Sequence, residues 1–281
     1  ERVRTYLLTV PDDPVAMRLL AELGTRLGEY EDAEFILDRC KQFHPDYLHA
    51  RFDLADVLGK RFHFAKALAE AEELVALEPD NPQFLMQRAN LMLQIGETRA
   101  ALAEYDRLAQ RDPANTMVSL TRGHALKTLG ELEAAIAAYR RAYEIRPDFG
   151  DAYWSLANLK TYRFTDTEMA AMAAHEALPG TAADDRIHLC FALGKALEDS
   201  KEFERSFTYY QRGNALKQDA VKYRAAMVTR EVDQQIAHCG PALFAAKTGS
   251  GCPAPDPIFI VGLPRAGSTL LEQILASHSQ V

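Results

Sequence analysis

Proline returns every 34 residues through the first half of the chain, at Pro11, Pro45, Pro79, Pro113 and Pro147. A fixed period of this size is typical of repeat proteins, in which one helical or strand unit stacks on the next. Small residues follow the same period, at Ala21, Ala55, Ala89 and Gly123 and again at Ala33, Ala67, Ala101 and Ala135. Glycine holds a third place, at Gly28, Gly96 and Gly130, with Phe62 as the exception. We therefore expect a linear stack of similar units.

This pattern resembles a tetratricopeptide repeat array, in which each repeat is a pair of antiparallel helices. The resemblance places complete repeats at 14–47, 48–81, 82–115 and 116–149, after a truncated repeat at 1–13. The small residues let the helices of a pair approach closely, and each proline ends one repeat and starts the next. The predicted fold class is an all-α superhelix over residues 1–220.

The period weakens after the fourth repeat. Tyr153 and Leu156 still predict the first helix of a fifth repeat, and residues 170–178 predict its second helix. A sixth unit, at about 187–220, follows a slip of three residues that a loop at 181–185 absorbs. The array is thus expected to become irregular towards its end.

Residues 221–239 carry apolar side chains at helical spacing and predict a connecting helix. Residues 240–257 hold three glycines and four prolines, a density of helix breakers that indicates a linker. We assign residues 221–256 to this connection and residues 257–281 to the start of a second domain.

The segment that begins at Pro257 has the pattern of an anion-binding site. Residues 258–261 form a short apolar run that predicts a buried strand, residues 262–267 a glycine turn, and Ser268 or Thr269 starts a helix through about Ala276. This order points several backbone amides and the positive end of a helix dipole at one place.

Comparison with the loop that binds nucleotide triphosphates narrows the class of anion that this turn could bind. Gly262, Gly267 and Thr269 keep the spacing of that loop, but Ser268 stands where it has lysine. Without the lysine, ATP or GTP hydrolysis and a nucleotide kinase are disfavoured. Arg265 is the one cation in the turn, and it suits a single phosphate-sized group that needs no metal.

The run Ile-Phe-Ile-Val-Gly-Leu-Pro-Arg-Ala-Gly-Ser-Thr-Leu-Leu-Glu resembles the phosphosulfate-binding loop of sulfotransferases, of the tyrosylprotein and bacterial tetratricopeptide type. Their usual loop reads Pro-Arg-Ser-Gly-Thr-Thr, so Ala266 and Ser268 depart from it. The resemblance implies an α/β domain of P-loop type and the co-substrate 3′-phosphoadenosine 5′-phosphosulfate (PAPS). It also implies the site residues: Arg265 as the catalytic residue, and Arg265, Ala266, Gly267, Ser268 and Thr269 as the residues that bind the co-substrate.

The family's glutamate base and its 3′-phosphate-binding segment lie downstream of this loop, so we expect them beyond Val281. Within the chain, Glu272 and His278 are weak candidates for a base, because helix position explains both. The first residue is not methionine, and we expect a chain cut at both ends, whose 281 residues alone are inactive.

The array offers a second candidate site. The place after the small residue of each first helix is polar, and it forms a column on the predicted concave side at Glu22, Asp56, Asn90, His124, Asn158 and Lys195. Asparagine in this place holds a peptide backbone in related arrays, so Asn90 and Asn158 are the candidates for binding a protein or peptide. A solvated face without a ligand is the alternative.

Composition limits the classes of function. The net charge of −8 disfavours nucleic acid and anionic membranes, which need a basic face. Four cysteines show no metal-binding spacing and indicate reduced thiols in a cytoplasmic protein. The predicted function is therefore transfer of a sulfuryl group from PAPS to a hydroxyl, such as that of a protein tyrosine, with no metal. The alternative is a non-catalytic tetratricopeptide scaffold for protein interactions.

Overall fold

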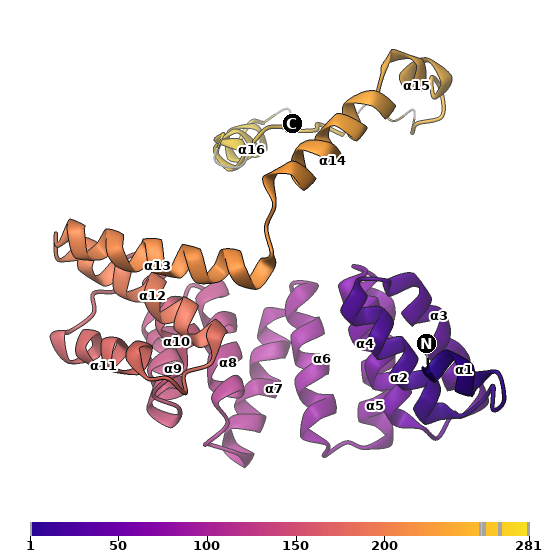
Figure 1. Cartoon of the computed structure of the whole chain (residues 1–281), viewed down its shortest axis with the longest axis horizontal. Helices are drawn as coiled ribbons and strands as arrows, with labels where there is room; N and C mark the ends of the chain where they lie inside the picture. Colours follow the sequence, from indigo (N-terminus) through magenta and orange to yellow (C-terminus); the bar gives the residue numbers. More distant parts are fainter. Residues whose placement is uncertain (1, 253, 255–256, 264–265, 280–281) are drawn as a thin grey trace. The chain divides into compact units, whose positions relative to one another are not determined.

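The computed structural model describes residues 2–252, 254, 257–263 and 266–279. Contacts divide the chain into two compact units, Glu1–Val221 and Lys222–Val281, which are treated separately below. The first unit consists of helices, of which α1 to α10 lie side by side in chain order (Figure 1). Their bounds are α1 (Arg2–Leu7), α2 (Pro14–Leu27), α3 (Tyr30–Phe43), α4 (Leu48–Lys60), α5 (Phe64–Leu77), α6 (Pro82–Gln94), α7 (Thr98–Arg111), α8 (Thr116–Thr128), α9 (Leu132–Ile145), α10 (Gly150–Ala157), α11 (Asp166–Ala177), α12 (Ala183–Asp199) and α13 (Phe203–Val221).

Helices α2 to α9 form four pairs, and each pair occupies one of the predicted 34-residue repeats. Each first helix packs against its own second helix and against the second helix of the preceding repeat, as α4 does with α5 and α3. The periodic alanines supply these contacts, because Ala21, Ala55, Ala67 and Ala101 are fully buried. The all-α tetratricopeptide superhelix expected from the proline period is confirmed.

Turn residues explain where the helices of a pair separate. Gly28, Gly96 and Gly130 all have φ between 81° and 87°, in the left-handed region where an L side chain meets its own backbone. Phe62 takes the same conformation, with φ of 62°. Phe62 therefore leaves the turn unchanged, although its backbone is strained where glycine would not be.

Within a pair, a small residue on the first helix faces an aromatic ring on the second. A Cβ atom added to Gly123 would lie 2.4 Å from the Tyr139 ring, and one added to Gly194 would lie 2.8 Å from the Tyr210 ring. Tyr139 itself is fully buried. The glycine is thus required because the ring occupies the space of a side chain.

The fifth repeat differs from its prediction. Helix α10 has eight residues and packs against α9 and α12, whereas α11 packs against α12. A Cβ atom on Gly150 would lie 2.2 Å from the Asp185 carbonyl oxygen, so α10 meets the start of α12 at a backbone contact. Helix α12 therefore takes the position beside α10 that a regular second helix would hold.

Two helix starts also differ from the sequence expectation. Helix α11 begins at Asp166 and not at residue 170, because Thr165 and Glu168 form a reciprocal capping box. Helix α12 begins at Ala183, inside the loop predicted at 181–185. Asp184 and Asp185 lie in its first turn, where acidic side chains favour the helix dipole.

The second unit contains α14 (Ala225–His238), α15 (Pro241–Ala246) and α16 (Ser268–Ala276). The connecting helix predicted over 221–239 corresponds to α14. Helix α15 lies inside the predicted linker, where Pro241 at the first helical position is preorganised for a helix. No strand is present in the described part of 257–281, so the predicted strand at 258–261 stays a prediction. A strand needs a paired neighbour for its backbone groups.

Substitutions at two helical glycines test the packing of a ring against a small residue. Gly123→Ala should destabilise the array, because overpacking against the buried Tyr139 ring costs about 1–3 kcal/mol and outweighs the gain in helix propensity. Gly59→Ala is the matched control in α4, since the nearest atom to its added Cβ is a Leu91 methyl at 3.4 Å. It should raise the free energy of unfolding by up to about 1 kcal/mol. Urea unfolding followed by circular dichroism measures both, and equal effects would contradict this account.

Candidate functional site: a polar groove and a glycine turn

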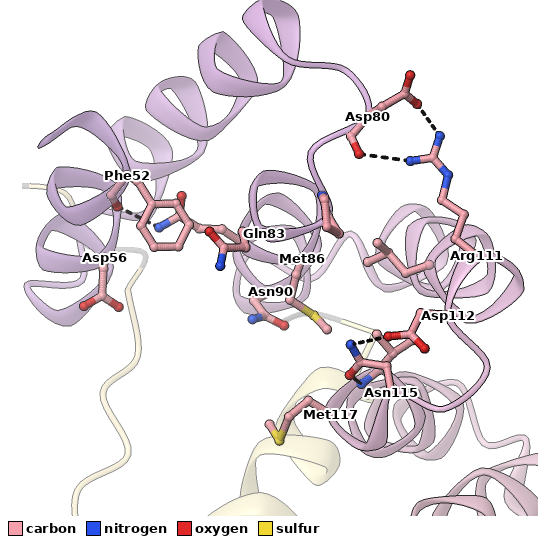
Figure 2. Close-up of a pocket in the computed structure, with 14 residues that line it drawn as sticks. Phe52, Asp56, Asp80, Gln83, Met86, Asn90, Arg111, Asp112, Asn115 and Met117 are labelled. Atoms are coloured by element: carbon pink, nitrogen blue, oxygen red, sulfur yellow. Dashed lines mark hydrogen bonds and ion pairs between the residues drawn. The ribbon is translucent and has the colours of Figure 1, made fainter. Parts of the chain in front are cut away.

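A groove of about 700 Å³ opens among the first helices of the second, third and fourth repeats. Figure 2 shows Phe52 and Asp56 from α4, Met86 and Asn90 from α6, and Met117 from α8 around it. Phe52 and Met86, like Asp56 and Asn90, stand 34 residues apart in equivalent places of successive repeats, so the stacking brings them to one face. The sequence column predicted Asp56 and Asn90 but not the apolar residues between them.

The two acidic members of the predicted column pair within their own helix. Glu22 forms an ion pair with Arg26 at 2.6 Å, and Asp56 forms one with Lys60 at 2.6 Å. These are exposed pairs four residues apart, which contribute only a few tenths of a kcal/mol. Each carboxylate is paired within its own helix, and about half of each side chain remains exposed to solvent.

Asn90 and His124 are instead bound by tyrosines from the second helix of their repeats. The Tyr105 hydroxyl donates to Asn90 Oδ1 at 2.7 Å, and the Tyr139 hydroxyl lies 2.9 Å from His124 Nδ1. Both tyrosines are fully buried, and burial raises the pKa of each hydroxyl, which keeps its proton. The periodic tyrosine, 15 residues after each polar residue, is the signal that could have revealed this pairing.

The column is interrupted at the fifth repeat. Asn158 is exposed and follows the last residue of the short helix α10 as its C-cap. Lys195 pairs with Asp199 on the same helix. Asn90 and His124 therefore share one arrangement, whereas Asn158 lacks the tyrosine beneath it, because Ala173 stands 15 residues further on.

The second candidate site is the glycine turn before α16. Gly267 has φ of 88° and is the N-cap, and the first helical bond runs from the Leu271 amide to the Gly267 carbonyl at 3.0 Å. The amides of residues 268–270 precede that bond and are free of the helix ladder. Ser268 and Thr269 place hydroxyls in the same first turn, so this end of α16 has the groups that an anion needs.

The rest of the loop is compact where it is described. The Ala266 amide donates to the Leu263 carbonyl at 3.1 Å, and a Cβ atom on Gly262 would touch Ala266 at 3.4 Å. Arg265, the predicted catalytic residue, lies outside the described residues. Glu272 lines a hollow with Ile258, Ile260 and Leu275.

The cysteines are free thiols, with Cys40 and Cys190 buried and Cys239 and Cys252 exposed. Burial raises the pKa of Cys190 to about 12, and the neighbouring Glu176 carboxylate adds to the shift. In the part of the chain that the structure describes, no cluster of His, Cys, Asp and Glu could hold a metal ion. None of the described helices combines the length and the hydrophobicity that crossing a bilayer requires.

Comparison with known families identifies both parts of the chain. A tetratricopeptide repeat model matches residues 52–116, and a TPR repeat model matches residues 123–160. Residues 52–160 are tetratricopeptide repeats. The sulfotransferase family model matches residues 257–281, the segment that holds the glycine turn. The chain thus combines tetratricopeptide repeats with a short sulfotransferase match.

Individual relatives are distant. A curated, uncharacterized protein of Aquifex aeolicus (strain VF5) is 30% identical over 123 residues, which are 44% of this chain and 16% of that protein. A thermophilic TPR protein of Thermus thermophilus is 22% identical, with a TM-score of 0.53 over 64% of this chain and 99% of its own. YrrB, described as a TPR protein with an unusual peptide-binding site, is 15% identical, with a TM-score of 0.47 over 75% of this chain and 98% of its own. The Thermus structure supports the fold.

The hydrogen-bonded pair of His124 and Tyr139 can be tested by changing the pH, because His124 titrates. Burial lowers the pKa of His124 below its usual value of about 6.5. The unfolded state then binds the proton more readily, so stability falls as the pH drops through about 6.5. His124→Asn copies the Asn90 and Tyr105 pair without the titrating ring. Urea unfolding at pH 7.5 and 5.5 should show a larger loss for the wild type than for the variant. Equal losses would remove His124 from the pH dependence.

Proposed function

We propose that this chain belongs to a sulfotransferase that moves a sulfuryl group from PAPS to a hydroxyl, and that the repeat array binds the protein or peptide that carries the hydroxyl. The observation that carries the proposal is the sulfotransferase match at 257–281, on a turn whose last glycine starts helix α16 at Ser268. Free amides and two hydroxyls at that helix start suit a phosphate group of the co-substrate.

In this proposal each residue of the turn has its own role. Gly267, Ser268 and Thr269 hold the 5′-phosphate, with Ala266 giving a backbone contact. Arg265 pairs with the bridging oxygen, where negative charge develops as the sulfur–oxygen bond breaks. The acceptor oxygen bonds to sulfur and gives its proton to a general base, leaving a sulfate ester and adenosine 3′,5′-bisphosphate. The chemistry needs no metal, because the arginine and amides neutralise the charge.

Arg265→Ala tests the catalytic part in a protein that carries the complete sulfotransferase domain. Transfer of ³⁵S-sulfate from labelled PAPS should fall on the order of 10²-fold or more, because one charged transition-state contact is lost. Glu272→Gln is the control within the same segment and should leave the rate within about twofold, because Glu272 lines a hollow with Ile258 and Ile260 and has no part in the proposed chemistry. Unchanged transfer by the arginine variant would remove Arg265 from the site.

A non-catalytic interaction scaffold is the second candidate function, and the groove beside Asn90 favours it. Both functions require that the array binds a protein segment. The double variant Asn90→Ala and Asn158→Ala should weaken binding of a natural partner isolated with the protein, mainly through Asn90, because its amide is fixed by Tyr105. Titration of each single variant separates the two residues. A partner that binds both single variants with wild-type affinity would make the column a solvated face.

A further inference from the structure

The groove at α4, α6 and α8 combines hydrogen-bond donors with an acidic surrounding. This combination specifies a partner more closely than the fold does. The inference rests on the proposed binding of a peptide segment by the array. It concerns what that segment must offer to Asn90, His124 and the residues around them.

Asn90 can act towards a ligand chiefly as a donor. Its Oδ1 accepts a hydrogen bond from the hydroxyl of the buried Tyr105, which keeps its proton at neutral pH because burial raises its pKa. Asn90 is an exposed residue that lines the groove, so its amide Nδ2 is the group that we assign to the ligand. A free asparagine could hold the N–H and C=O of a peptide together, but this one is held in a single orientation.

His124 repeats the arrangement one repeat later, on α8 beyond the residues that line the groove itself. Tyr139 is fully buried. Among the described residues, the hydrogen-bond partner of its hydroxyl is His124 Nδ1. When the tyrosine donates to Nδ1, the neutral ring carries its own proton on Nε2. Burial lowers the pKa of His124, which favours this neutral ring. Two successive repeats thus present neutral N–H donors.

The charges around the groove are mostly negative. Asp56, Asp80 and Asp112 line it, and Lys60 pairs with Asp56 from the same helix. Arg111 pairs with Asp80 (Figure 2). Asp112 has no ion pair within the described residues, and it accepts instead from the Ala114 amide at 3.2 Å. A carboxylate or phosphate ligand would satisfy the donors but meet this negative field, so anions are disfavoured.

The floor of the groove is apolar. Phe52, Met86, Met117 and Val118 contribute to it, and Met117 keeps 51% of its surface exposed. Methionine adapts its shape to different apolar side chains. The floor therefore suits an aliphatic or aromatic side chain.

We propose that the groove binds an extended peptide segment in which an apolar residue is flanked by lysines or arginines, and that Asn90 and His124 donate to backbone carbonyl oxygens of this segment. A backbone carbonyl is a neutral acceptor, so it satisfies the donors without the charge that the aspartates repel. Basic side chains satisfy the aspartates, and the apolar side chain covers the methionines. Tyr105 and Tyr139 are the positioning residues that make the column a row of donors.

The binding test uses two fluorescein-labelled, C-terminally amidated peptides, Gly-Lys-Arg-Leu-Lys-Arg-Gly and Gly-Glu-Asp-Leu-Glu-Asp-Gly, in anisotropy titrations with the 281-residue chain. The basic peptide should bind at least tenfold more tightly. Because the chain carries a net charge of −8, variants that leave charge unchanged separate the groove from general attraction. Asn90→Ala should weaken binding about tenfold and Met117→Ser about fivefold. Leu132→Ser, at an exposed residue of α9 outside the groove, should leave it unchanged.

The outcomes distinguish this inference from the proposed function. Tighter binding of the acidic peptide, or binding of the basic peptide that ignores both groove variants, would overturn the groove assignment while leaving peptide binding by the array intact. Failure of both peptides to bind, together with capture of a natural partner that Asn90→Ala does not weaken, would overturn it as well. Self-association that Met117→Ser abolishes, measured by sedimentation, would assign the groove to a second copy of the chain and overturn the peptide assignment.

A ligand-free measurement tests the positioning by tyrosine. Long-range ¹H–¹⁵N spectra of the chain should show His124 as the Nε2–H tautomer. Tyr139→Phe should change the tautomer ratio while circular dichroism retains the helical signal. The Nδ1–H tautomer in the wild type would overturn the donor assignment, because His124 would then present an acceptor to the ligand.

Discussion

The contact between a small residue on one helix and an aromatic ring on its partner governs much of the array. Where the first helix has Gly123, the Tyr139 ring fills the space of the missing side chain. The ring sets how closely the helices approach, and its hydroxyl ends beside the polar residue that follows the glycine. Ala89, Asn90 and Tyr105 repeat the order in the preceding repeat. Core packing and groove chemistry therefore depend on the same residue.

The irregular end of the array follows from a change in that partnership. After α10 the chain forms α11 through a capping box, and Glu168 of that box also accepts from Tyr143 at 2.8 Å. This ties α11 to α9, while α12 takes the place beside α10. The Arg146 guanidinium reaches Asp185 at 2.7 Å and helps hold the start of α12 there. The three-residue slip read from the sequence is thus a change of packing partner.

The segment at 257–281 has a different physical character. No side chain of α16 is buried, and Phe259 and Val261 are more than four-fifths exposed. Apolar runs of this kind are typical of strands covered on both faces in α/β domains. The exposure is consistent with the proposal that the glycine turn works as part of a larger sulfotransferase domain. The start of α16 already has its geometry, because a glycine N-cap and a helix end are local features.

The repeat length, the helix pairs of the first four repeats and the start of α16 could all be predicted from the sequence. They depend on period, on proline and glycine, and on interactions a few residues apart. The polar column through Asn90 and His124 was predictable for the same reason. The sequence could not predict which atoms of Asn90 and His124 stay open to a ligand. Those atoms are decided by Tyr105 and Tyr139, which reach the two residues from the other helix of each pair. The partner of α10 and the apolar floor of the groove likewise depend on contacts between repeats, which a linear pattern does not specify.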